Sequence, residues 1–175
     1  MEPKKSAFPV ALKYAIITSL ASFIFSVILY MTGLYLNNGI QWLGFIILLV
    51  GLIFTIKDRR DKDLGGFITF GQAFGAGFLF CIIVGLIGVL TTYIMMNFIA
   101  PDMVEQLLKV TEQKLIDKGM SDDQIQVAMN MTKKFMTPVM MAVWTVVGTA
   151  FIGCILSLIV AAIMKKESKQ LQQPQ

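Results

Sequence analysis

The chain has 175 residues and a formal net charge of +4, with 56% hydrophobic and 15% charged residues. Soluble domains are roughly 45–50% apolar, so this composition excludes an ordinary soluble domain. Histidine is absent, which removes the commonest metal ligand and general base. The basic residues flank apolar segments, where they act as membrane-topology signals, so the positive charge does not predict nucleic-acid binding.

The charged residues are segregated into positions 2–13, 57–63, 102–134 and 165–169. A charge at the bilayer centre costs at least about 2.5 kcal/mol, so long uncharged runs are typical of membrane spans. The sequence therefore predicts an all-α integral membrane protein with one membrane domain, residues 1–175. Its four transmembrane helices are expected over about 10–35, 40–56, 70–99 and 138–164.

The first expected span begins near Val10, and its one charge, Lys13, is close enough to the end to reach the interface. Its apolar run is too long for a signal peptide, so it is predicted to be a retained anchor. The Asn- and Gly-containing segment 36–39 predicts a tight turn. Trp42 then stands near the start of the second span, where interfacial aromatics are common.

Residues 57–63 predict a solvated loop, because three aspartates alternate there with four basic residues. A Mg²⁺ site is the alternative for these carboxylates. Thr69 and Gln72 have the spacing of a capping box at the start of the third span. Gln72 could instead bind a ligand.

Residues 100–137 form a polar insert that predicts two amphipathic helices. Pro101 suits a first helical turn, Gly119 suits a helix C-terminus, and Ser121 with Gln124 fits a second capping box. The insert is expected to be an extracytoplasmic helical hairpin between the third and fourth spans. Its apolar residues form a candidate partner surface: Leu107, Leu115, Ile125, Met129 and Phe135.

The distribution of Lys and Arg predicts the orientation. Ten basic residues fall at the two ends of the chain and in 57–63, and five fall in the insert. We therefore expect cytoplasmic N- and C-termini, with residues 165–175 as a flexible tail.

Small residues recur at every fourth position of the last two spans, as in closely packed membrane helices. They are Ala73, Gly77, Cys81 and Gly85 in the third span, and Thr149, Gly153, Ser157 and Ala161 in the fourth. The alternative interpretation is a narrow polar path lined by Ser19, Ser22, Ser26, Thr149 and Ser157.

No charged residue lies deep in any span, and no nucleotide-binding, hydrolase or Cys-x-x-Cys motif occurs. We therefore expect no catalytic, cofactor-binding or metal-binding residues, and no enzyme. The outer half is rich in methionine, and Met136 and Met140 could offer two thioethers to Cu(I) or simply fill apolar space.

The stretch Gly66-Phe67-Ile68-Thr69-Phe70-Gly71-Gln72-Ala73, with the charged segment before it and Ala100-Pro101 after the third span, resembles an uncharacterised bacterial membrane family, domain of unknown function 4199. The resemblance covers nearly the whole chain. Because the family is chiefly found in Bacteroidetes, it implies a location in the bacterial inner membrane. It implies no activity, cofactor or catalytic residue, and its gene neighbourhoods imply a glycosyltransferase as a partner.

These observations favour a non-enzymatic protein of the lipid bilayer that assembles with another envelope component, with the helical insert as its recognition element. The alternative is a small oligomeric channel or carrier for neutral or lipidic solutes. A homo-oligomer is compatible with either hypothesis.

Overall fold

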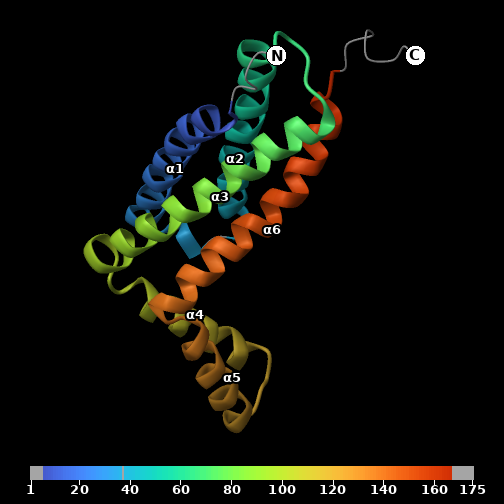
Figure 1. The fold of residues 1–175 in the computed structure, drawn as a ribbon. Helices are drawn as coiled ribbons and strands as arrows, with labels where there is room; N and C mark the ends of the chain where they lie inside the picture. Colours follow the sequence, from blue (N-terminus) through green and yellow to red (C-terminus); the bar gives the residue numbers. More distant parts are fainter. Residues whose placement is uncertain (1–5, 37, 167–175) are drawn as a thin grey trace.

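The computed structural model describes residues 6–36 and 38–166, which are almost entirely helical (Figure 1). The α-helices are α1 (Phe8–Met31), α2 (Asn38–Asp58), α3 (Phe70–Ile94), α4 (Met103–Asp117), α5 (Asp122–Phe135) and α6 (Pro138–Met164). A 3₁₀ turn, η1 (Leu34–Leu36), precedes α2, and π-helical turns η2 (Arg59–Asp63) and η3 (Met95–Ile99) extend α2 and α3. Within the described residues there is no strand, so the predicted all-helical class is confirmed.

Three helices of the described chain are long and apolar enough to cross a membrane: Phe8–Met31, Phe70–Ile99 and Val139–Met164. At about 1.5 Å per residue each exceeds the roughly 30 Å hydrocarbon thickness of a bilayer. They coincide with the first, third and fourth expected spans. The second expected span, 40–56, lies within α2, which has 21 residues.

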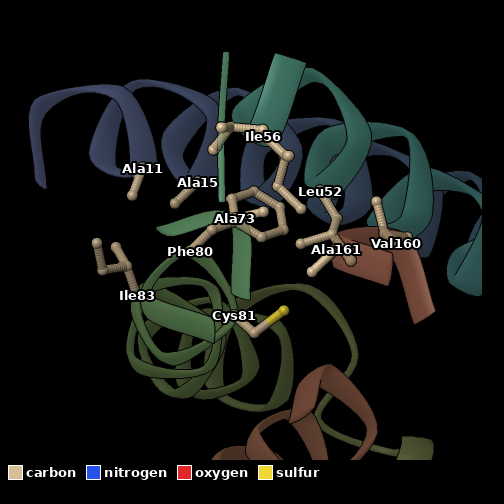
Figure 2. Close-up of a cluster of buried hydrophobic side chains, with 11 residues drawn as sticks. Ala11, Ala15, Leu52, Ile56, Ala73, Phe80, Cys81, Ile83, Val160 and Ala161 are labelled. Carbon is tan, nitrogen blue, oxygen red and sulfur yellow. The ribbon is translucent and has the colours of Figure 1, made fainter. Parts of the chain in front are cut away.

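The other three long helices pack around α3, with α1 and α6 on opposite sides of it (Figure 1). The core joins small residues of α1 to larger ones of α2 and α3 (Figure 2). Ala11 and Ala15 are fully buried, as are Leu52, Ile56 and Phe80. The alanines let α1 approach closely, and the larger side chains fill the space between α2 and α3.

The turn between α1 and α2 lies earlier than the predicted segment 36–39. The Thr32 hydroxyl donates to the carbonyl of Ile28 at 2.8 Å, and Gly33 follows with φ +69°. A hydroxyl that competes for the helix carbonyls and a left-handed glycine together end α1 at Met31. Gly39 is consequently part of α2, and Asn37 lies outside the described residues.

The segment 57–63 is helical rather than the predicted loop, and it is only partly solvated. The helix continues through Asp58 into η2, and Arg59 is only 7% exposed. Its guanidinium Nη1 donates to Asp63 at 3.0 Å and to the carbonyl of Ser6 at 3.0 Å. A buried guanidinium is tolerable only when it is paired, and these bonds hold the wide turn closed. The sequence did not reveal the burial of Arg59, because alternating charges are equally typical of a solvated segment.

Pro101 is also placed differently from the prediction, since α4 begins only at Met103. The amide of Ala100 donates to the carbonyl of Met95 at 2.7 Å, which completes η3 and leaves Pro101 in the connection.

The end of α6 is joined to the segment before α3 by an antiparallel bridge between Ile68 and Lys166. Both amides donate to the opposite carbonyl at 2.9 Å, and Ile68 is buried. Residues 165–166 are therefore held in place rather than being the start of a flexible tail. The remainder of the predicted tail, 167–175, lies outside the described residues.

Candidate functional site

The small-residue strips lie at the contact between α3 and α6. Ala73, Cys81, Ser157 and Ala161 are fully buried, and Gly77, Gly85 and Gly153 are buried beside them. A Cβ atom added to Gly153 would lie 2.4 Å from Cβ of Cys81, so the two helices meet there without room for a methyl group. Gly85 faces Thr149, whose Cβ would be 3.5 Å from an added methyl. The strips are thus a packing surface.

Thr69 and Gln72 form the capping box at the start of α3. The Thr69 hydroxyl accepts from the amide of Gln72 at 3.4 Å, and the Gln72 side chain accepts from the amide of Thr69 at 3.1 Å. The side-chain oxygen of Gln72 is therefore occupied with its own helix terminus rather than free for a ligand.

The polar path is not assembled by the structure. Thr149 and Ser157 lie in the α3–α6 contact, and Ser157 is beside Gly77. Ser19 is buried and has no hydrogen-bond partner within the described part of the chain. Ser22 and Ser26 instead line a cavity between α1, α3 and α6.

A charge cluster stands where α1 begins and α2 ends. Asp58 accepts from the Tyr14 hydroxyl at 2.8 Å and pairs with Lys62 at 2.8 Å and Lys13 at 3.6 Å. Donation from Lys62 is the main cause that holds the pKa of Asp58 below its ordinary range. Among the described residues, no group of three His, Cys, Asp or Glu side chains could hold a metal ion.

The polar insert contains two helices, α4 and α5, which are in contact with each other. Gly119 has φ +72°, and its amide donates to the carbonyl of Ile116 at 2.8 Å, which ends α4. The Gln124 side chain accepts from the amide of Ser121 at 3.1 Å and caps α5. Both ends of the connection are thereby ordered by local hydrogen bonds.

The five candidate partner residues are divided by the structure. Ile125 and Met129 are 8% and 7% exposed, so they belong to the core between α4 and α5. Leu107 and Leu115 are half-buried. Phe135 is 50% exposed, and its ring lies 6.4 Å from that of Trp144 at the start of α6.

The sequence interpretation missed two exposed residues of α5, Val127 and Met131, which are 63% and 60% exposed. With Phe135 they recur every four residues and share one face. We call these three side chains the α5 stripe. The spacing was readable in the sequence, but nothing there distinguished this face from the one that packs on α4.

The base of α4 is tied to the end of α1 by side-chain hydrogen bonds. The Tyr30 hydroxyl donates to Asp102 at 2.6 Å, and the Tyr35 hydroxyl donates to Gln106, which itself donates to Asp102. Donation from Tyr30 is the main cause that holds the pKa of Asp102 below its ordinary range. These contacts fix α4 and α5 relative to the long helices.

The long apolar helices, the buried small-residue contact and the ordered α4–α5 pair together define an all-helical integral membrane protein. The family model described as "Protein of unknown function (DUF4199)" matches residues 13–166, and the chain belongs to this family. The resemblance seen in the sequence is thereby confirmed. No curated protein and no solved structure matches the chain.

Proposed function

We propose that the chain crosses the bacterial inner membrane four times, with both termini in the cytoplasm. In addition to α1, α3 and α6, α2 would be a membrane span. In this proposal α4 and α5 form an extracytoplasmic hairpin that recognises another envelope protein, and the chain catalyses no reaction. A glycosyltransferase is the first partner class to test.

The observation that carries this proposal is the exposure of the α5 stripe. Val127, Met131 and Phe135 are each at least 50% exposed, while Ile125 and Met129 are buried on the side of α5 that packs against α4. Because the inner face already satisfies the packing of the pair, the outer apolar face is left for a contact beyond it. An apolar surface of a second protein would remove it from water.

The hydrogen bonds of Asp102 support this role. They anchor the start of α4 to Tyr30 at the end of α1, which holds α4 against the long helices. A pre-organised surface loses less conformational entropy on binding than a mobile loop.

The test is co-purification of the tagged full chain from native membranes, with partners identified by mass spectrometry. We expect Met131→Ser with Phe135→Ser to reduce the recovered partner at least about tenfold, as for loss of a central apolar contact. Ile116→Ser is the control, because this residue of α4 is also 50% exposed and lies outside the stripe. Unchanged capture after residues 104–134 are replaced by a Gly-Ser linker would refute the proposal. Recovery of only a second copy of this chain would mean that the stripe mediates self-association instead of binding another protein.

A further inference from the structure

A cavity of about 490 Å³ lies between α1, the end of α3 and the first turns of α6. Its volume is within the roughly 300–1,000 Å³ of small-molecule sites. Ser22 and Ser26 face it from α1, Thr92 from α3 and Trp144 from α6, so three separate helices converge on it. The surface used by the α5 stripe does not contribute to this lining.

The hydroxyl groups that line the cavity differ in whether they already donate a hydrogen bond. Thr91 and Thr145 donate to the carbonyls of Gly88 and Met141 within their own helices, at 3.0 and 2.8 Å. Within the described residues, the hydroxyls of Ser22, Ser26 and Thr92 have no hydrogen-bond partner. The cavity thus presents three unused donors from α1 and α3.

The chemistry of the lining selects a neutral acceptor. No charged side chain lines the cavity, whereas a phosphate or carboxylate would be expected to meet Lys or Arg. Unpaired hydroxyl donors suit the carbonyl oxygen of an ester. Four methionines complete the wall, namely Met95, Met96, Met103 and Met141. Their flexible thioethers adapt to an alkyl chain of variable shape.

The depth of the cavity agrees with this ligand. Ser26 stands five residues before Met31, the last residue of α1, which is about 7.5 Å along the helix axis. The Ser26 hydroxyl therefore lies just inside the end of an apolar span, near the boundary between hydrocarbon and headgroups, and Thr92 stands similarly near the end of α3. Glycerolipids carry their ester linkages at that boundary. Ser22 stands nine residues before Met31, about 13.5 Å along the axis, and so lies deeper.

We propose that this cavity binds one glycerolipid, with an ester carbonyl accepting from Ser26 or Thr92 and one acyl chain reaching inward past Ser22. None of the three stripe residues lines this site, so lipid binding does not require a protein partner. It makes the chain a lipid-binding protein as well as an assembly component.

The test uses tryptophan quenching, since the chain has two tryptophans and one of them, Trp144, lines the cavity. The full chain carrying Trp42→Phe is placed in vesicles of diether phosphatidylcholine. A small mole fraction of phosphatidylcholine with a brominated chain is added, in either the diester or the diether form. We expect Trp144 to prefer the diester form about fivefold, which corresponds to one net hydrogen bond of about 1 kcal/mol.

Ser26→Ala with Thr92→Val should reduce this preference, because it removes both proposed donors, whereas Ser19→Ala should leave it unchanged. Ser19 is the matched control because it is on the same helix and does not line the cavity. Unchanged unquenched emission of Trp144 would show that the variants retain their fold. Equal quenching by the two lipids would overturn the proposal, as would a diester preference that survives the double substitution. In a chain carrying Trp144→Phe, quenching of Trp42 reports the surrounding lipid. If Trp42 showed the same diester preference as Trp144, the preference would not belong to the cavity, and the proposal would also be overturned.

Discussion

Among the glycines of α3 and α6, Gly153 has the least room for a side chain, because an added Cβ would lie 2.4 Å from Cβ and 2.7 Å from Sγ of Cys81. An added methyl at Gly77 meets mainly the end of the Leu52 side chain, at 2.7 Å, and that side chain can move. At Gly148, also in α6, nothing lies within 4 Å. Steric tolerance therefore varies sharply among glycines that look alike in the sequence.

Gly153→Ala should consequently destabilise the fold by about 1–3 kcal/mol, as for other overpacked contacts. Gly77→Ala should have a smaller effect. Gly148→Ala should be neutral or stabilising, because alanine favours a helix over glycine by roughly 0.8–1 kcal/mol. Reversible unfolding in detergent, followed by circular dichroism, measures the order. Equal stabilities for Gly153→Ala and Gly148→Ala would contradict the close contact.

Asp102 gives the base of α4 a defined pH dependence. Its pKa is lowered in the folded chain, chiefly by donation from Tyr30, so the ionised form stabilises the fold. The contribution is fully present above the ordinary carboxyl pKa and is lost as the pH falls through the lower folded value. We expect protection of 103–117 from hydrogen exchange, corrected for the intrinsic rate, to fall below about pH 4.

In Asp102→Asn this acid step should be absent, since the amide does not titrate but can still accept from Tyr30. Tyr30→Phe should lower the protection of 103–117 already at neutral pH. If wild type and Asp102→Asn show the same acid step, another carboxyl controls it.

At the scale of the helices, the two faces of α5 have opposite roles. Ile125 and Met129 are buried against α4, whereas Val127 and Met131 are exposed. Met129→Ser should therefore destabilise the α4–α5 pair by about 2–5 kcal/mol, and Met131→Ser should change it by less than about 0.5 kcal/mol. Hydrogen exchange of residues 103–135 reports this difference. Similar loss of protection in both variants would mean that the assignment of faces is wrong.

Helix bounds were largely predictable because their causes are local. Uncharged runs indicated residues 70–99 and 138–164, which the structure forms as Phe70–Ile99 and Pro138–Met164. The capping pair Thr69 and Gln72 depends on residues three apart, so spacing alone revealed it. The candidate strips on α3 and α6 were equally visible as a repeat of four.

Contacts between distant residues were not predictable in this way. Tyr30 and Asp102 are 72 positions apart, and no periodicity connects them. The bridge between Ile68 and Lys166 likewise joins the segment before α3 to the segment after α6, which are far apart in the sequence. Burial of Arg59 depends on Ser6 and Asp63 together, so the charge pattern of 57–63 indicated a loop instead.

In the whole molecule, the distribution of charged residues and the arrangement of the helices both distinguish two ends. The start of α1, the end of α2 and the end of α6 lie at one end, and α4 and α5 lie at the other (Figure 1). Lys13, Asp58 and Lys62 form their cluster at the first end, where the Ile68–Lys166 bridge also lies. The insert at the opposite end contains five basic and six acidic residues. The excess of Lys and Arg at the first end supports our proposal that this end is cytoplasmic.

This orientation predicts the accessibility of cysteines in intact spheroplasts. Cys81 and Cys154, both free thiols, are first replaced by alanine, and a single cysteine is then placed at Lys118 or Lys62. Lys118 is exposed between α4 and α5, and the Lys62 side chain is 66% exposed beyond α2. Since burial hides neither position, only the membrane can protect one of them. A membrane-impermeant thiol reagent should label Lys118→Cys in spheroplasts, and should label Lys62→Cys only after lysis. Labelling of Lys62→Cys alone before lysis would invert the proposed topology, and labelling of both would mean that residues 57–63 and the α4–α5 pair lie on the same side.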